Sequence, residues 1–354
     1  MFTPELMPKL FAWSNEGLRF ERHYAGSNHS ESGLFGLVFG RSALTYHSTL
    51  NAHAEPTLLR ALRRLGYRAG YFTGHPERWL RREEFMNRAT LDDFERDDVG
   101  SWNDWDRRAL ARASAYVKSD RPSIAVTFLM SSHYEYRYPK EFERHLPADP
   151  PCVAWLPGEA SPDEFEANRN RYLNVAGFVD ALVAEHVRSL DASETWIVFT
   201  GDHGETTGET GRFGHGYDFS EDLTRVPFVL RGPGVGAGVR QDLTMHQDVV
   251  ATFLNELGQE IPTGGASRSL LVPSERSSLL QAYAEPGRRH VDALLLVGAW
   301  RVRLGLELDD GTLEVVGFED ASGRAVSVEP SDADVEQIRR AFIVELESAG
   351  ASPP

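Results

Sequence analysis

A carboxylate and an imidazole stand side by side in Gly201-Asp202-His203-Gly204-Glu205, directly after the strand-like run Trp196-Ile197-Val198-Phe199-Thr200. Strand ends are where α/β sheets place their binding sites. Asp202 offers a hard oxygen and His203 a borderline nitrogen, a donor pair that suits zinc or manganese better than calcium. The dipeptide alone is weak evidence, because either residue is more often a cap or a solvated surface group. Its meaning depends on the residues that follow.

The residues after this pair continue a pattern of glycines, acids and histidine. Gly208-Glu209-Thr210-Gly211 is followed by Gly214-His215-Gly216 and then by Arg225-Val226-Pro227-Phe228-Val229. Such a series is much harder to obtain by chance than a dipeptide. The longer pattern therefore favours a functional site over isolated surface residues.

A second polar stretch, Gly26-Ser27-Asn28-His29-Ser30-Glu31-Ser32-Gly33-Leu34-Phe35-Gly36, leads from a loop into an apolar helix. A helix N-terminus points free N–H groups outward and favours an anion such as a phosphate. Ser27, Ser30 and Ser32 offer hydroxyl groups that could act as a nucleophile beside a metal ion. The alternative is that these serines only cap the helix, as serine often does.

Short apolar runs alternate with longer helical patterns, which is typical of an α/β fold with a mostly parallel sheet between two helical layers. The expected strands are runs of apolar and β-branched residues: Arg68–Thr73, Ser123–Met130, Thr195–Thr200 and Val226–Arg231. The helices are expected over Leu6–Glu16, Ser32–Phe39, Glu55–Leu65, Asp104–Lys118, Pro162–Leu190, His246–Leu257 and Asp332–Ser348.

The pattern changes near the C-terminus. From Ala282 to Val328 the sequence indicates short alternating strands, and Asp309-Asp310-Gly311 is typical of a hairpin turn. We therefore expect residues 1–275 to form one α/β core. Residues 276–354 should add a small antiparallel sheet and a terminal helix to the same fold.

Composition narrows the classes of partner. The formal net charge of −16 argues against broad binding to nucleic acid or to an anionic membrane face, since both reward clustered Lys and Arg. Cys152 is the only cysteine, so the chain can form neither an internal disulfide nor a thiolate metal cluster. The apolar runs are shorter than the roughly 18 residues of a membrane span, and the first residues do not resemble a signal peptide. The chain as given is expected to be soluble.

These motifs resemble those of the alkaline phosphatase superfamily, in particular its sulfatase-like enzymes and the bacterial envelope phosphoethanolamine transferases and lipoteichoic acid synthases. The resemblance also includes Leu6 to Phe20, Tyr172 to Asp180 and His246 to Gly258. It implies an alkaline-phosphatase-like α/β fold. It also implies metal-dependent transfer of a phospho group from a phosphate ester, with an envelope lipid or glycan head group as the expected substrate.

The resemblance implies roles for individual residues. Asp202 and His203 would be metal ligands, and Ser30, where relatives usually carry threonine, would be the nucleophile and a third metal contact. His215 and His133 would lie at a second metal or at the substrate phosphate, although His133 taken alone could be a loop histidine. Two further candidates are Asn28 and Glu205.

Sulfatases of this superfamily usually mature a cysteine or serine within a Cys/Ser-x-Pro-x-Arg motif to formylglycine. The corresponding stretch here, Ser30-Glu31-Ser32-Gly33-Leu34, has neither the proline nor the arginine. We therefore expect phosphate esters rather than sulfate esters, with a serine-linked phospho-enzyme intermediate.

In these relatives a hydrophobic strand precedes the first helix and ends in a metal-binding Asp or Glu. Only Met1 to Pro4 precede that helix here, which is too short for such a strand. One explanation is a truncated enzyme whose full-length form reaches the periplasmic face of a bacterial membrane through segments outside this chain. The second is a degenerate member that binds lipid or a partner without catalysis. A third hypothesis is an ordinary soluble phosphodiesterase.

Overall fold

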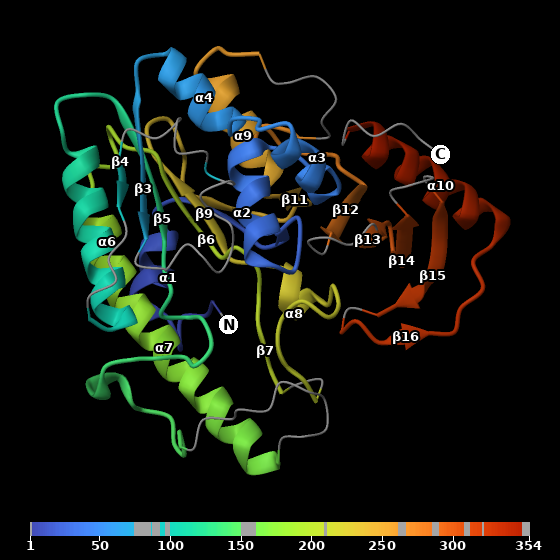
Figure 1. The fold of residues 1–354 in the computed structure, drawn as a ribbon, viewed down its shortest axis with the longest axis horizontal. Coiled ribbons are helices and arrows are strands. Elements are labelled where there is room, and N and C mark those ends of the chain that lie inside the picture. The colour runs from blue at the N-terminus through green and yellow to red at the C-terminus, as the bar shows by residue number, and fades with distance from the viewer. Residues whose placement is uncertain are drawn as a thin grey trace.

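The computed structural model of the chain describes residues 2–73, 86, 93–95, 100–149, 161–208, 211–260, 267–284, 290–307, 312–320 and 322–348. Three features of the sequence lie outside the described residues: Cys152, Glu209-Thr210 and the expected turn at Asp309-Asp310-Gly311. Within the described ranges, an α/β core carries a separate antiparallel sheet near the C-terminus (Figure 1).

Two groups of strands form the sheet of the core. In the first, β3 pairs in parallel with β4 and β5. The second has the order β10-β1-β9-β6, and β9 runs antiparallel to both β1 and β6, so this group is mixed rather than parallel. All expected strands are present, whereas the short β1 and β10 are not indicated by the sequence pattern. The bounds are β1 Leu18–Phe20, β3 Arg68–Thr73, β4 Asp93–Glu95, β5 Ser123–Phe128, β6 Ile197–Thr200, β9 Phe228–Arg231 and β10 Gly238–Arg240.

Two further pairs of strands are very short. Strand β11 pairs in parallel with β2, and β8 pairs antiparallel with β7. Their bounds are β2 His23–Tyr24, β7 Thr206–Thr207, β8 Phe213–Gly214 and β11 Thr244–Met245.

Each expected helix is present, with its ends shifted by two residues or fewer. Helices α6 and α7 begin at capping boxes, in which Ser101 and Ser161 exchange hydrogen bonds with Asp104 and Glu164. The expected helices are α1 Pro8–Ser14, α2 Ser30–Phe39, α4 Thr57–Arg64, α6 Trp102–Val117, α7 Pro162–Arg188, α9 Gln247–Glu256 and α10 Asp332–Ser348. Two short helices, α3 Tyr46–Asn51 and α8 Glu221–Thr224, are not indicated by the sequence pattern. In the described ranges we find no helix with the length and apolar character that crossing a membrane requires.

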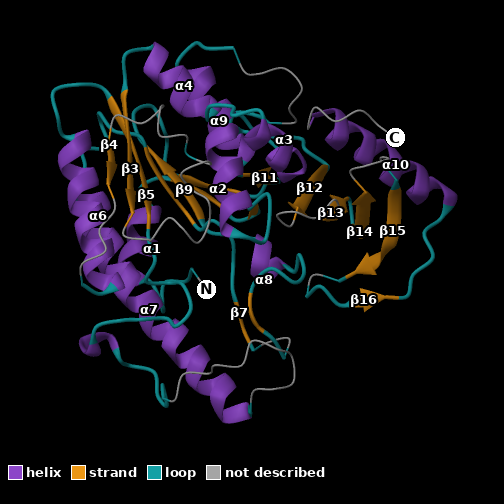
Figure 2. Ribbon diagram, in the orientation of Figure 1, coloured by secondary structure: helices purple, strands orange, loops and turns teal. Residues whose placement is uncertain are grey.

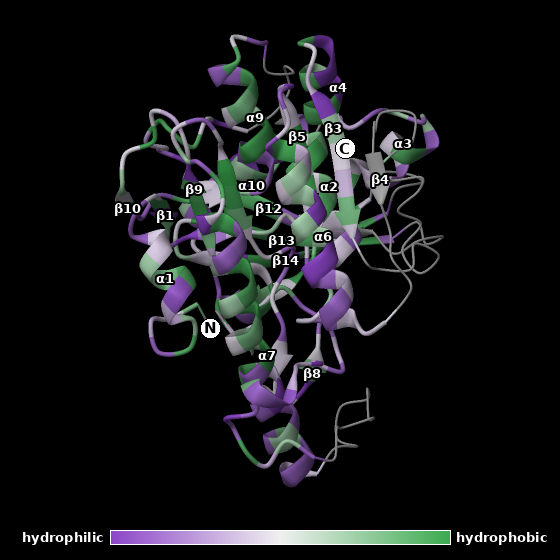
Figure 3. Ribbon diagram, turned by 90° about the vertical axis from the view of Figure 1, so that its left-hand side faces the viewer, coloured by the Kyte–Doolittle hydropathy of each residue, from purple (hydrophilic) through white to green (hydrophobic). Residues whose placement is uncertain are grey.

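Helices cover the core sheet on both faces. Along β9, Val229 packs with α1, α6 and α7, whereas Phe228 and Leu230 pack toward α9. This alternation follows from the two-residue period of a strand. Helices α2 and α4 share the second layer with α9. Figure 3 shows the resulting pattern, with apolar residues on the inner strands and hydrophilic stretches on the outer turns of α6 and α7.

The C-terminal part is an antiparallel meander in the order β12-β13-β14-β15-β16 (Figure 2). Helix α10 packs Phe342 and Leu346 against one face of this meander, where they meet Leu280 and Val302. The expected terminal sheet and helix are therefore confirmed, whereas the proposed division at residue 275 stays a prediction. The strand bounds are β12 Ser278–Ala284, β13 His290–Val297, β14 Trp300–Glu307, β15 Leu313–Glu319 and β16 Ala325–Val326.

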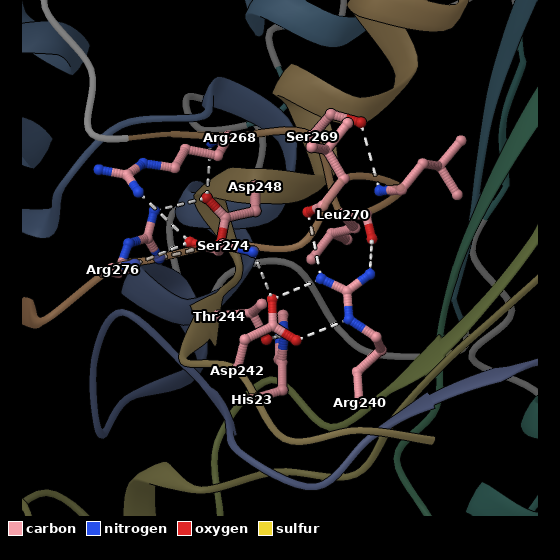
Figure 4. Close-up of polar contacts among 12 residues, drawn as sticks. His23, Arg240, Asp242, Thr244, Asp248, Arg268, Ser269, Leu270, Ser274 and Arg276 are labelled. Carbon is pink, nitrogen blue, oxygen red and sulfur yellow. Dashed lines mark hydrogen bonds and ion pairs between the residues drawn. The ribbon is translucent and has the colours of Figure 1, made fainter. Parts of the chain in front are cut away.

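A buried ion pair fastens α9 to the segment that leads into β12 (Figure 4). The two terminal nitrogens of Arg276 donate to the two carboxylate oxygens of Asp248 at 2.9 and 2.8 Å. Asp248 also accepts hydrogen bonds from the backbone N–H groups of Met245 and Arg268. The pair therefore ties the α/β core to the C-terminal sheet through a carboxylate with four donors.

Candidate active site

Ser30 is the first residue of helix α2, and its side chain faces the end of strand β6. Its hydroxyl oxygen lies 2.9 Å from Nε2 of His203. Gly33 packs so closely on Asp202 that a Cβ at residue 33 would lie 2.1 Å from the Asp202 carbonyl oxygen. The glycine therefore allows the N-terminus of α2 to meet the Asp202-His203 turn.

The other two candidate serines do not reach this contact. Ser27 and Ser32 are buried, and in the described part of the chain neither hydroxyl has a hydrogen-bond partner. Among the serines of the polar stretch, the geometry therefore favours Ser30 as the nucleophile.

Strand β6 ends just before Asp202 and His203, and this places both residues beside Ser30. The carboxylate oxygen Oδ2 of Asp202 lies 3.6 Å from Nε2 of His203. Burial alone would raise the pKa of Asp202, but His203, the Ser30 hydroxyl and His215 outweigh it and hold this pKa below its usual value. Asp202 is therefore an anion at neutral pH and can attract a cation.

Hydrogen bonds at Nδ1 fix how two of the histidines face the site. Nδ1 of His203 lies 2.7 Å from the carbonyl oxygen of Gly204, and Nδ1 of His133 lies 2.7 Å from that of Tyr134. A carbonyl can only accept, so in both rings Nδ1 carries the proton and, when the ring is neutral, Nε2 carries the lone pair. This tautomer is the one that a metal ligand or a proton acceptor at Nε2 needs.

His215 lies at the centre of a group of four imidazoles. Its ring centroid is 4.1 Å from that of His203, 5.9 Å from that of His29 and 6.2 Å from that of His133. Nδ1 of His215 lies 3.2 Å from the Glu205 carboxylate. Burial acts to lower the pKa of His215, but Glu205 and Asp202 outweigh it and raise this pKa above its usual value. His215 is therefore the imidazole of this group best placed to carry a proton.

His29 belongs to this group, although it is not among the predicted site residues. Its ring stacks on Tyr283 of β12, with centroids 3.5 Å apart, and its Nδ1 lies 2.9 Å from the side-chain oxygen of Asn28. Asn28 in turn donates to the backbone carbonyl of Asp218 at 2.6 Å. These two hydrogen bonds of the Asn28 side chain therefore fix the orientation of the His29 ring. Burial, together with His215 and His203, lowers the pKa of His29 to about 3, so this ring stays neutral.

Signals for these additional residues differ. His29 directly precedes Ser30, so the polar stretch before α2 already contains it. Tyr283 comes from the C-terminal meander, and nothing in its own neighbourhood marks it. The contact shows that the antiparallel sheet supplies one wall of the site.

The donors beside Ser30 fit a divalent cation in kind but are few in number. They are one carboxylate, one imidazole nitrogen and one hydroxyl, which suit zinc or manganese. Within the described residues no group of three or more His, Cys, Asp or Glu side chains is arranged to hold a metal ion. A structural zinc site usually has four protein ligands and a catalytic one three. Metal binding at Asp202, His203 and Ser30 therefore stays a proposal.

Comparison with known proteins identifies a family and a fold. The sequence profile of the sulfatase family matches residues 2–258. The inner membrane protein YejM of Salmonella typhimurium strain LT2 is 25% identical over 259 residues, which are 71% of this chain and 38% of YejM. The chain thus spans well under half the length of that relative.

Solved structures agree with this fold. The phosphonate monoester hydrolase SpPMH from Silicibacter pomeroyi superposes with a TM-score of 0.71 at 18% identity, covering 96% of this chain and 90% of that one. The lipoteichoic acid synthase LtaP from Listeria monocytogenes gives a TM-score of 0.66 at 16% identity, covering 98% of this chain and 87% of that one. Both likenesses are to the fold, and they confirm the expected alkaline-phosphatase-like α/β architecture.

Proposed function

Because this chain belongs to the sulfatase family, we propose that it transfers a phospho group from a phosphate ester to water or to an acceptor hydroxyl through a Ser30-linked intermediate. The observation that carries this proposal is the placement of the Ser30 hydroxyl 2.9 Å from Nε2 of His203, at the N-terminus of a ten-residue helix. A nucleophile at that position meets an anionic ester where free N–H groups already favour it.

His215 and the histidines around it can act on the phosphate group of the substrate. His215, whose pKa Glu205 raises, can donate a proton to the leaving ester oxygen as the Ser30 oxygen bonds to phosphorus. The Nε2 atoms of His203 and His133 are the proton-accepting or ligating nitrogens of those rings. His133 and His215 thus act at the phosphate in this proposal.

Asp202, His203 and the Ser30 oxygen would hold the cation, for which zinc or manganese fits the donors best. When bound, it would lower the pKa of the Ser30 hydroxyl and stabilise charge on the transferring group. Asp202, an anion at neutral pH, supplies the charge that attracts it. His203 is held by the Gly204 carbonyl in the tautomer that ligation requires.

A phosphate ester is favoured over a sulfate ester by the residues around Ser30. The stretch Ser30-Glu31-Ser32-Gly33-Leu34 lacks the proline and arginine of the sulfatase maturation motif. An unmodified serine suits phosphate esters, since it can form and release a covalent phospho-enzyme.

An envelope lipid or glycan head group is the substrate class that we propose. Support comes from two likenesses: YejM is an inner membrane protein and LtaP is a lipoteichoic acid synthase. The same likenesses support action at the periplasmic face of a bacterial membrane. The acidic net charge of −16 supports a small-ester substrate rather than nucleic acid.

A second candidate is a member that binds a phosphorylated head group without turning it over. The number of metal donors favours it, because in the described residues the Ser30 hydroxyl adds to only one carboxylate and one imidazole, and no group of three His, Cys, Asp or Glu side chains is arranged to hold a metal ion. The four grouped imidazoles would serve binding as well as catalysis. Direct measurement of a covalent intermediate separates the two candidates.

The test is a panel of p-nitrophenyl phosphate, bis-(p-nitrophenyl) phosphate and p-nitrophenyl sulfate, with and without added zinc or manganese, followed by peptide mass spectrometry of the acid-quenched protein. We expect hydrolysis of a phosphate ester, little of the sulfate, and a phospho adduct on the Ser30 peptide that the Ser32→Ala control retains. Saturable binding of phosphate esters without turnover or adduct would favour the binding protein. An adduct on another residue would reject Ser30 as the nucleophile.

A further inference from the structure

The His133 loop, residues 129–137, follows strand β5 directly. Within it, the backbone N–H of His133 donates to the carbonyl oxygen of Met130 at 2.9 Å, and that of Tyr136 donates to the carbonyl oxygen of His133 at 2.8 Å. Tyr136 has a φ of 52°, a left-handed conformation that a residue with a Cβ disfavours. Such a conformation persists only where the surrounding structure holds it. The contacts around this loop therefore decide where His133 lies.

Asp106, in the second turn of helix α6, holds the start of the His133 loop. Its two carboxylate oxygens accept hydrogen bonds from the backbone N–H groups of Met130 and Ser131 at 2.9 and 2.8 Å. Asp106 is 0% exposed, so water does not compete for these bonds. Burial raises the pKa of Asp106 to about 6, and the hydrogen bonds from Ser131 and Met130 act against this rise. At neutral pH the side chain is therefore mostly an anion, with one oxygen for each N–H group.

Asn103 connects the two ends of the same loop. Its side-chain nitrogen donates to the hydroxyl oxygen of Ser131 at 3.0 Å and to the backbone carbonyl oxygen of Arg137 at 2.8 Å. Asn103 and Asp106 are three residues apart on α6, so they lie on one face of the helix. Helix α6 itself packs on β3 and β5 (Figure 1). The loop is therefore attached to an element of the core.

The His133 ring lies between the start of α6 and His215. It is edge-on to the ring of Trp102, the first residue of α6, with centroids 5.9 Å apart, and its centroid is 6.2 Å from that of His215. Its Nδ1 donates to the carbonyl oxygen of Tyr134, which leaves Nε2 to act in the site. A misplacement of about 1 Å in a group that acts on a substrate can cost on the order of 100-fold in rate. A displaced loop would therefore affect the chemistry.

We propose that Asp106 and Asn103 are positioning residues of the candidate active site, which hold the His133 loop so that Nε2 of His133 faces the substrate phosphate. The inference rests on the proposed function, in which His133 acts at that phosphate. Neither Asp106 nor Asn103 touches the substrate in this proposal, and each acts through His133. Their types fit the task, because a carboxylate accepts from two N–H groups and an amide nitrogen donates to two oxygens.

A double-mutant cycle on kcat/KM, with the phosphate ester that the substrate panel selects, separates positioning from folding. In Asp106→Asn the side-chain nitrogen cannot accept from an N–H group, so we expect kcat/KM to fall on the order of 10-fold or more. In a His133→Ala background the same substitution should have almost no further effect. Asn103→Ala should behave in the same way, and it replaces Asp106→Asn if that variant does not fold. Equal losses in both backgrounds would assign these residues a structural role only.

The matched control is Asp104→Asn, which makes the same chemical change on the same helix. Asp104 is exposed and bonds to Ser101 in the capping box of α6. We expect this variant to unfold at a lower urea concentration while its kcat/KM stays unchanged. A fall in kcat/KM as large as that of Asp106→Asn would place the effect in the stability of the helix and contradict positioning.

Proton–nitrogen correlation NMR of the imidazoles gives a readout without turnover, with the His133 signals identified by their loss in His133→Ala. The parent protein should show one tautomer of His133, protonated at Nδ1. In Asp106→Asn and Asn103→Ala the nitrogen shifts should move toward a mixture of tautomers, because the ring is no longer held. If they move while no ester is turned over, the proposed reaction fails and the placement of His133 by α6 stands. Unchanged His133 signals in both variants would overturn the inference, with or without turnover.

Discussion

Two polar centres in this molecule each contain an aspartate, and they use it in different ways. Around Asp248, every carboxylate oxygen has donors: two backbone N–H groups and both terminal nitrogens of Arg276 (Figure 4). Around Asp202, the neighbours are His203 and the Ser30 hydroxyl, and the residue lines a large cavity. The first centre is saturated, whereas the second faces space that a ligand can enter.

The difference shows how a structural carboxylate is told from a functional one. Asp248 and Arg276 are 2% and 3% exposed, so their pairing only holds α9 to the C-terminal sheet. Removing one partner leaves an uncompensated buried charge. Asp202 keeps acceptor capacity directed at a group of imidazoles. We therefore expect changes at the Asp248 centre to affect folding and changes at the Asp202 centre to affect chemistry.

The largest expected effect is that of Ser30→Ala on turnover. Loss of the nucleophile should lower kcat for a phosphate ester by at least about 10³-fold. The free energy of unfolding should fall by only about 1 kcal/mol, because the substitution keeps the buried Cβ and removes one hydroxyl group. The matched control is Ser32→Ala, a buried serine on the same helix whose hydroxyl makes no hydrogen bond to His203 in the described structure. Equal losses in both variants would place the effect in helix packing and not in the nucleophile.

Asp248→Asn tests the structural role of the Asp248 centre. The substitution removes the charge that compensates Arg276 in a buried position and should lower the free energy of unfolding by about 3–5 kcal/mol. Urea unfolding followed by circular dichroism measures this loss. In the fraction that remains folded, KM should stay near that of the parent protein. A stable Asp248→Asn variant with a raised KM would contradict the structural role.

Two buried histidines, His23 and His246, should make the folded protein less stable in acid. Burial, with neighbouring His246 and Arg276, lowers the pKa of His23 well below its ordinary value, and burial lowers that of His246 to about 4. Below about pH 6.5 the unfolded chain binds these protons and the folded chain does not, so stability falls as the pH falls. Each group contributes at most about 1.4 kcal/mol per pH unit.

His23→Asn isolates one of these groups. Asparagine can keep the hydrogen bond to Thr244, which His23 makes at 3.0 Å, but it cannot take up a proton. Urea midpoints at pH 7.5, 6 and 5 should therefore fall less steeply in the variant, with a residual slope from His246. An unchanged slope would show that His23 does not contribute to acid sensitivity.

The smallest expected effect comes from a residue of neither centre. Ser101→Ala removes the capping box of α6 and should cost about 1 kcal/mol of stability without altering kcat. Thermal unfolding and initial rates measure both quantities. This variant sets the background against which the other changes are judged, and a large fall in kcat would show that α6 is coupled to the site.

Local sequence signals predicted most elements because each carries its own pattern. Helix α7 follows from a long helical pattern between Pro162 and Leu190, and β3 from a run of apolar and β-branched residues. The short strands β1 and β10 were missed because three residues cannot show a period. They exist through pairing with segments far along the chain.

The candidate site was predicted unevenly for the same reason. Asp202 and His203 stand out locally, since a strand ends directly before them. The contact between Ser30 and His203 joins residues 173 positions apart, so only the family resemblance indicated it. The stacking of Tyr283 on His29 depends on how the C-terminal sheet docks, and no local signal contains it.

Elemental analysis of bound metal tests the central claim most directly. It would compare the parent protein with the Ser30→Ala and Asp202→Asn variants. The account predicts zinc or manganese in the parent, most of it retained in Ser30→Ala, and loss in Asp202→Asn. Equal metal content in the parent and Asp202→Asn, or none in the parent, would contradict a metal site at Asp202 and His203.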